Sequence, residues 1–188
     1  MNRSIKSIFR EMPVLTTERL TLRKMLKSDY SDMFEYASDP EVTKYLTWHP
    51  HPDKNYTLKY LSYIQSKYKS GDFYDWAIVY NDKMIGTCGF TSIDPINLKA
   101  EIGYVISPFF RNRNFATEAV TRIIEFGFET LELNRLEAHY MEENSASRRV
   151  MEKCDMKFEG IYRESLLIKG NFVSVGVCSI LKKDWNNK

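Results

Sequence analysis

Residues 99–131, KAEIGYVISPFFRNRNFATEAVTRIIEFGFETL, decide the fold of this chain. The first eight residues alternate in polarity, with Ile102, Tyr104 and Ile106 on one face, which predicts a strand. Proline cannot donate to a strand ladder, so the strand ends at residues 107–108. From Ala116 to Gly127 the apolar residues recur at the spacing of a helix. The stretch therefore predicts a strand, a tight loop and an amphipathic helix.

This arrangement favours an anion site at the start of the helix. The first backbone N–H groups of a helix lack intrahelical partners and carry the positive end of the helix dipole. Two arginines, Arg111 and Arg113, stand beside those amides in the sequence. The ligand that suits such a site is a phosphate or a pyrophosphate.

The loop at residues 111–116, Arg-Asn-Arg-Asn-Phe-Ala, resembles motif A of the GNAT superfamily of acyl-CoA N-acyltransferases. The motif is written Gln/Arg-x-x-Gly-x-Gly/Ala, and this chain has Asn114 in place of the first glycine. Asparagine is enriched among the non-glycine residues that adopt positive φ, so we expect Asn114 to keep the shape of the loop.

A second stretch, residues 144–160, resembles motif B of the same superfamily, Asn-x-x-Ser followed by Glu-Lys-x-Gly-Phe/Met. Asp155 stands where the motif has glycine after its helix, and aspartate also tolerates the left-handed position that ends many helices. Nearly the whole chain is similar to the ribosomal-protein-alanine acetyltransferase (RimJ/RimL-like) branch. In proteins of that branch the final hairpin often carries aspartate at the position where this chain has Ser174. The residues that match motif B are Asn144, Ser147, Glu152, Lys153 and Met156.

Length and composition indicate one ordinary globular domain, residues 1–188. With 43% hydrophobic residues the chain can fill a core, and no apolar run approaches the ~20 residues of a membrane span. The start, MNRSIKSIFREMP, does not have the pattern of a signal peptide. Three scattered cysteines indicate neither a metal site nor a disulfide framework, which favours a reducing, cytoplasmic setting.

Net charge and motifs argue against three other classes of function. A net charge of +2 gives no sign of nucleic-acid or membrane binding. The chain also lacks the Gly-x-x-x-x-Gly-Lys-Ser/Thr loop of nucleotide hydrolases.

The predicted fold is α/β (α+β), a mixed and mostly antiparallel sheet of seven strands with helices on both faces. Residues 1–12 are expected to form a short helix. The resemblance implies that the strands at 99–106 and 135–141 are parallel neighbours that splay apart. The seven strands are expected at 15–25, 76–80, 84–92, 99–106, 135–141, 158–168 and 172–181.

The resemblance also implies acetyl-CoA as co-substrate, and no metal. Its pantetheine arm would lie in the gap between the splayed strands and bond to strand backbone. Its pyrophosphate would lie on the loop amides. The residues implied in coenzyme binding are Tyr104, Val105, Ile106, Arg111, Arg113, Asn114, Phe115, Ala116, Thr117 and Asn144.

The implied reaction is direct attack of a neutral primary amine on the thioester. Glu101 is the candidate that takes the proton, with Glu164 as the alternative base, and each could instead be an ordinary strand carboxylate. A backbone N–H near Val105 would stabilise the oxyanion. Ser147 would protonate the departing thiolate, although a serine in the first turn of a helix can also be purely structural.

The predicted acceptor is a protein N-terminal α-amine or a small amine. Trp48, His49 and His139 are expected to border its site, with His51 nearby; a hydrophobic lid over the core is the alternative for the loop at 47–53. A different class of function also stays open, a non-catalytic acyl-CoA-binding module of the same fold. The chain is expected to be a monomer or a homodimer, without membrane or direct nucleic-acid partners.

Overall fold

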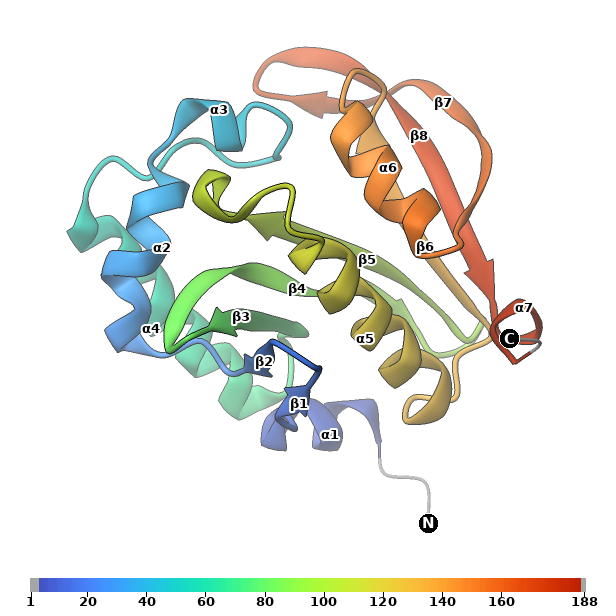
Figure 1. Cartoon of the computed structure of the whole chain (residues 1–188), viewed down its shortest axis with the longest axis horizontal. Coiled ribbons are helices and arrows are strands. Elements are labelled where there is room, and N and C mark those ends of the chain that lie inside the picture. The colour runs from blue at the N-terminus through green and yellow to red at the C-terminus, as the bar shows by residue number, and fades with distance from the viewer. Residues whose placement is uncertain (1–3, 187–188) are drawn as a thin grey trace.

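In the computed structural model, which describes residues 4–186, a single mixed sheet has the strand order β1-β2-β3-β4-β5-β6-β8-β7 (Figure 1). All neighbouring strands are antiparallel except β5 and β6, which are parallel. The mixed, mostly antiparallel sheet is thus confirmed. The strands are β1 (Leu15–Thr16), β2 (Thr21–Arg23), β3 (Asp75–Tyr80), β4 (Lys83–Asp94), β5 (Lys99–Ile106), β6 (Arg135–Met141), β7 (Lys157–Ile168) and β8 (Asn171–Leu181).

The sheet has eight strands, so the prediction of seven is wrong by one. The segment expected as one strand at 15–25 folds back on itself, and Leu15 pairs with Leu22 across a tight turn. Glu118, about a hundred residues away, accepts from the Thr17 hydroxyl and from the Arg19 amide. These contacts favour the turn over a continuous strand, and pattern reading along 15–25 alone could not detect them.

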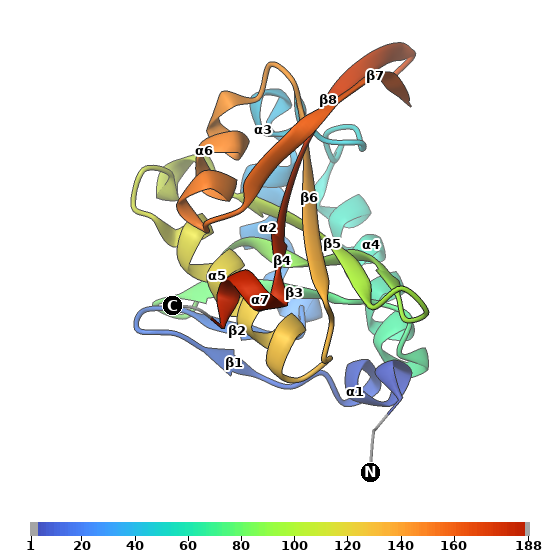
Figure 2. The same cartoon turned by 90° about the vertical axis from the view of Figure 1, so that its right-hand side faces the viewer.

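Helices cover both faces of this sheet. Helices α5 and α6 lie on one face, and α4 lies on the other, as the side view shows (Figure 2). The expected N-terminal helix at 1–12 is present as α1, while residues 1–3 lie outside the described part of the chain. The helices are α1 (Ile5–Glu11), α2 (Tyr30–Ala37), α3 (Pro40–Thr43), α4 (Lys54–Ser70), α5 (Phe115–Glu129), α6 (Ser145–Lys153) and α7 (Lys182–Trp185), with short 3-10 turns at Lys27–Asp29 and Pro108–Phe110.

Helix α5 packs on the strands that carry the candidate site. Its apolar stripe, which includes Val120, Ile123 and Ile124, is fully buried. At Gly127 the helix approaches β6 so closely that an added Cβ would lie 3.0 Å from the Leu136 side chain. Each large aliphatic side chain buried in this way contributes roughly 1.5–3 kcal/mol, so the start of α5 is held firmly relative to the sheet.

A buried carboxyl group lies at the start of β3. Asp75 Oδ1 is buried without a hydrogen-bond partner within residues 4–186, and the nearby Tyr36 hydroxyl is in the same situation. Burial raises the pKa of Asp75 to about 7 from an ordinary value of 3.8, although contacts with Thr87 and the Trp76 amide oppose the shift. The folded protein therefore keeps this proton to a higher pH than the unfolded chain does.

This carboxyl group is expected to make the protein less stable as pH rises from about 4 to about 7, because in that window the folded state binds the extra proton. Asp75→Asn should raise the free energy of unfolding by about 2 kcal/mol at pH 8, below the full value of ~1.4 kcal/mol per pKa unit, and should have little effect at pH 4. Denaturant unfolding at both pH values measures the change. Asp72→Asn, at an exposed carboxylate paired with Lys6 at 2.8 Å, is the control. An equal gain at both pH values would contradict the assignment.

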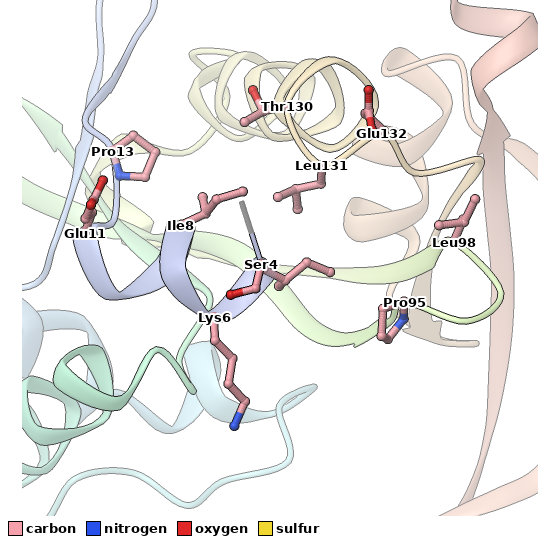
Figure 3. Close-up of a pocket in the computed structure, with 11 residues that line it drawn as sticks. Ser4, Lys6, Ile8, Glu11, Pro13, Pro95, Leu98, Thr130, Leu131 and Glu132 are labelled. Carbon is pink, nitrogen blue, oxygen red and sulfur yellow. The ribbon is translucent and has the colours of Figure 1, made fainter. Parts of the chain in front are cut away.

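A broad hollow of about 1020 Å³ lies between α1, the β4–β5 turn and the end of α5. Ile8 and Leu131 face one another across it (Figure 3). None of the residues predicted to bind coenzyme or substrate lines this hollow. Within residues 4–186, no helix combines the length and apolar composition that a membrane span requires.

Candidate functional site

The gap predicted between two parallel strands is present. Strands β5 and β6 pair only from Lys99/Arg135 to Glu101/Glu137. Beyond that point β5 stays with β4 and β6 stays with β8, so the two strands diverge (Figure 1). The backbone of β5 beyond Glu101 therefore has no strand partner on the β6 side. A free strand edge of this kind can bond to the amides of an extended ligand.

A cavity of about 390 Å³ opens from this gap on the side of α5 and α6. Apart from Arg113, all the residues predicted to bind the coenzyme line it. They are Tyr104, Val105, Ile106, Arg111, Asn114, Phe115, Ala116, Thr117 and Asn144.

The loop before α5 has the backbone shape that the sequence predicted. Asn114 has φ 61° in the left-handed region, and so does Asn112. The first helical amide with a backbone acceptor is that of Glu118, which bonds the Asn114 carbonyl at 2.9 Å. The amides of Phe115, Ala116 and Thr117 before it have no acceptor within the helix. Such an arrangement of backbone N–H groups suits a phosphate oxygen.

Arg113 does not line the cavity. Its guanidinium lies over the Phe110 ring at 5.7 Å, and its carbonyl accepts from Arg19 at 3.1 Å. The structure therefore does not bring its side chain into the cavity, and its contact with a phosphate stays a prediction.

Three basic residues that the sequence reading did not assign line the cavity instead. Arg149 and Lys153 come from α6, and Lys44 follows α3. Lys153 Nζ donates to Asn114 Oδ1 at 2.8 Å, which joins α6 to the anion loop. The signal that could have found the α6 pair is their spacing of four residues, which places them on one helix face.

Ser147 is hydrogen-bonded to Tyr104 across the cavity. The Tyr104 hydroxyl lies 2.8 Å from Ser147 Oγ and donates to the Ser147 carbonyl at 2.9 Å. Asn144 caps α6, since its side chain accepts from the Ser147 amide at 3.2 Å. Burial raises the pKa of Tyr104 well above its ordinary value, so its hydroxyl keeps its proton at neutral pH. The pair therefore holds two exchangeable protons at the cavity wall.

On the other face of the sheet, three titratable side chains gather where the strands part. Glu101 and Glu137 are the last paired residues of β5 and β6. His139 Nδ1 lies 3.7 Å from Glu101 Oε1, and its Nε2 lies 3.9 Å from Glu137 Oε1. The side chain of Glu101 is 30% exposed, the most of the three. Sequence reading missed Glu137, because only the strand register places it beside Glu101.

The loop residues expected around the acceptor lie apart from the cavity. Trp48 packs partly buried against the core and near the His51 ring, and His49 is exposed. His51 is buried, and its Nδ1 lies 2.8 Å from the Thr57 hydroxyl. Glu164 is exposed in an irregular part of β7. The acceptor role of Trp48 and His49 stays a prediction.

Comparison with known proteins gives a consistent result. Residues 19–157 match the family model described as an acetyltransferase (GNAT) domain. The chain is 38% identical over 176 residues to Uncharacterized N-acetyltransferase p20 of Bacillus licheniformis, which covers 93% of this chain and 99% of that protein. It is 24% identical over 180 residues to the [ribosomal protein uS5]-alanine N-acetyltransferase of Escherichia coli, covering 91% and 92%. A solved GNAT-family acetyltransferase from Bacillus anthracis has a TM-score of 0.80 and 25% identity, covering 91% and 99%.

Proposed function

The chain belongs to the GNAT acetyltransferase family, as an acyl-CoA N-acetyltransferase, and from this premise we propose that its acceptor is a protein N-terminal α-amine. A small-molecule amine is the second candidate. We also treat residues 1–188 as a single domain, because one sheet takes strands from residue 15 to residue 181.

We assign the coenzyme to the cavity between α5 and α6. The backbone amides of the anion loop hold the pyrophosphate, and Arg111 adds charge that suits phosphate. The free edge of β5 bonds the extended arm, and Asn144 contacts the same arm from the start of α6. This placement is supported by the cavity, the two left-handed asparagines and the first-turn amides of α5, which have no acceptor within the helix.

Three groups carry the chemistry in this proposal. Glu101 takes a proton from the acceptor ammonium on the open face of the gap. A β5 backbone N–H near Val105 stabilises the oxyanion as the amine attacks the thioester. Ser147 protonates the departing thiolate and regains a proton from solvent, while its 2.8 Å contact with the Tyr104 hydroxyl holds it in position.

The preference for an α-amine depends on the bases that face the gap. These are the carboxylates of Glu101 and Glu137 and the imidazole of His139, and none of them is a base strong enough to deprotonate a lysine amine efficiently. An α-amine, with a pKa of about 7.7–8.0, is already about a tenth neutral at pH 7, whereas a lysine at about 10.4 is almost fully charged. The name of the Escherichia coli relative, an alanine N-acetyltransferase of ribosomal protein uS5, supports the same class of acceptor.

One observation favours the second candidate. Two carboxylates at one strand pair attract an acceptor that carries more than one positive charge, such as a polyamine.

A matched set of acceptors tests the assignment. Peptides with a free Ser, Ala or Met N-terminus should be acetylated, and the same peptides with a blocked N-terminus and a free lysine should not. Polyamines and aminoglycosides form the small-amine arm. Acetylation of small amines but of none of the peptides would overturn the proposal of a protein acceptor and would support a small-molecule amine instead.

Ser147→Ala is expected to lower kcat roughly 10- to 100-fold, because the thiolate loses its proton donor. Acetyl-CoA affinity should change less than about threefold, since the amide of residue 147 and the Asn144 cap remain. Steady-state kinetics and calorimetric titration with acetyl-CoA measure the two effects. Equal losses in turnover and affinity would indicate a binding role instead.

A further inference from the structure

The cluster at the start of the gap contains more than one proton acceptor. Alternation along β6 places the buried side chains of Leu136 and Ala138 on the α5 side, so Glu137 and His139 point to the opposite face. Glu101 is level with Glu137 in the strand register. Within residues 4–186, His139 is the one positively ionisable group in ion-pairing range of Glu101.

Arg135 holds the Glu137 carboxylate in place as part of a chain of ion pairs. Arg135 Nε donates to Glu137 Oε2 at 2.9 Å, while the two terminal nitrogens of Arg135 donate to Glu159 at 2.7 and 2.6 Å. Contacts with Arg135 and Ser179 lower the pKa of Glu159 to about 2. Arg135 is thereby held in place, and Glu137 keeps a carboxylate oxygen directed at the imidazole.

Only one ring nitrogen of His139 is placed to exchange a proton with the acceptor amine. Its Nε2 is buried, and no described residue forms a hydrogen bond with it. The Tyr162 ring, at 6.1 Å, covers another side of the imidazole. Its Nδ1 is directed at Glu101, the more exposed member of the cluster. A proton can therefore reach His139 from the acceptor by way of Glu101.

Building on the proposed function, we propose that His139 is a positioning residue that relays the proton collected by Glu101. The acceptor ammonium gives one proton to the Glu101 carboxylate and becomes a neutral amine. Glu101 passes this proton to His139 Nδ1 and is again a carboxylate, and the imidazolium then lies between two carboxylates. After the acetylated product leaves, the imidazolium returns the proton to solvent by way of Glu101. The 3.7 Å separation needs to shorten by less than 1 Å for this transfer, which is typical of sites without bound substrate.

The relay predicts a particular pH dependence. In the unsubstituted enzyme kcat/KM should fall on the acid side along a limb that belongs to the enzyme, because a protonated His139 cannot accept a proton. Two acceptors with different amine pKa values separate this limb from titration of the substrate. If the acid limb reports titration of the amine, its midpoint changes with the pKa of the acceptor. If it reports a group of the enzyme, its midpoint is the same for both acceptors.

His139→Asn keeps a polar group near the Nδ1 position but cannot accept a proton. We expect its acid limb to move to lower pH, with the plateau of kcat lowered about tenfold and acetyl-CoA affinity unchanged. Unchanged affinity also shows that this variant is folded, because the coenzyme cavity lies on the other face. An acid limb at its original position would overturn the relay.

Glu137→Gln is a second test variant, and it leaves the imidazole of His139 in place. Its amide oxygen still accepts from Arg135, but the imidazolium loses one neighbouring carboxylate, so the acid limb should shift to lower pH by about half a unit or more. No shift in either variant would contradict the proposal. Any amine that the enzyme acetylates serves for these profiles, so a wrong acceptor assignment would not be mistaken for failure of the relay.

Discussion

Asn114→Pro is expected to weaken acetyl-CoA binding about 100-fold or more. Proline locks φ near −65°, whereas residue 114 has φ 61°, so the loop must change its shape. The substitution also removes one amide and the contact that Lys153 makes with Asn114. One lost charge-assisted hydrogen bond of about 1.5–3 kcal/mol, together with local strain, corresponds to about 100-fold in affinity.

Asn114→Gly is the matched control. Glycine adopts this φ without steric cost and keeps the amide, so affinity should stay within about threefold of the original. Calorimetric titration with acetyl-CoA measures both variants, and thermal unfolding checks that each is folded. Equal affinities for the proline and glycine variants would contradict the assignment of the pyrophosphate to this loop.

Glu101→Gln is expected to lower kcat at pH 7 about tenfold with an α-amine acceptor, because the amide cannot take the proton of the acceptor and only about a tenth of that amine is already neutral. The loss should shrink as pH rises above the pKa of the amine, where the acceptor arrives already neutral. Acetyl-CoA affinity should be unchanged, since Glu101 does not line the coenzyme cavity.

Kinetics from pH 6 to 9 test this prediction. Glu125→Gln, at a surface residue of α5 that pairs with Arg122 at 2.9 Å, is a control for removing a carboxylate far from the gap. A kcat for Glu101→Gln that equals the control at every pH would exclude Glu101 as the base.

The anion loop shows what sequence reading could predict. Both glycines that the resemblance led one to expect are replaced, by Asn114 and Asp155, and both residues have φ 61°. The prediction succeeded because backbone shape at these positions depends on a local property, the tolerance of asparagine and aspartate for positive φ.

Features that depend on distant residues were missed. The turn at Thr17–Leu20 is favoured by Glu118 on α5, so the local alternation of 15–25 indicated one strand where there are two. The side chain of Arg113 packs over the Phe110 ring and does not line the cavity, so its contact with a phosphate stays a prediction. The position of Glu137 beside Glu101 follows only from the pairing register of β5 and β6.

In the proposed reaction, the gap between β5 and β6 brings the thioester of acetyl-CoA to a primary amine on the Glu101 side. The most direct test follows thiol release from acetyl-CoA in the presence of the acceptor set, with mass spectrometry of the acceptor. We predict one thiol released for each acetyl group gained by an amine, and an equal decrease of both signals, about tenfold with an α-amine acceptor, in Glu101→Gln at pH 7. Tight acetyl-CoA binding without thiol release or acetylated amine, across all acceptors, would contradict the account.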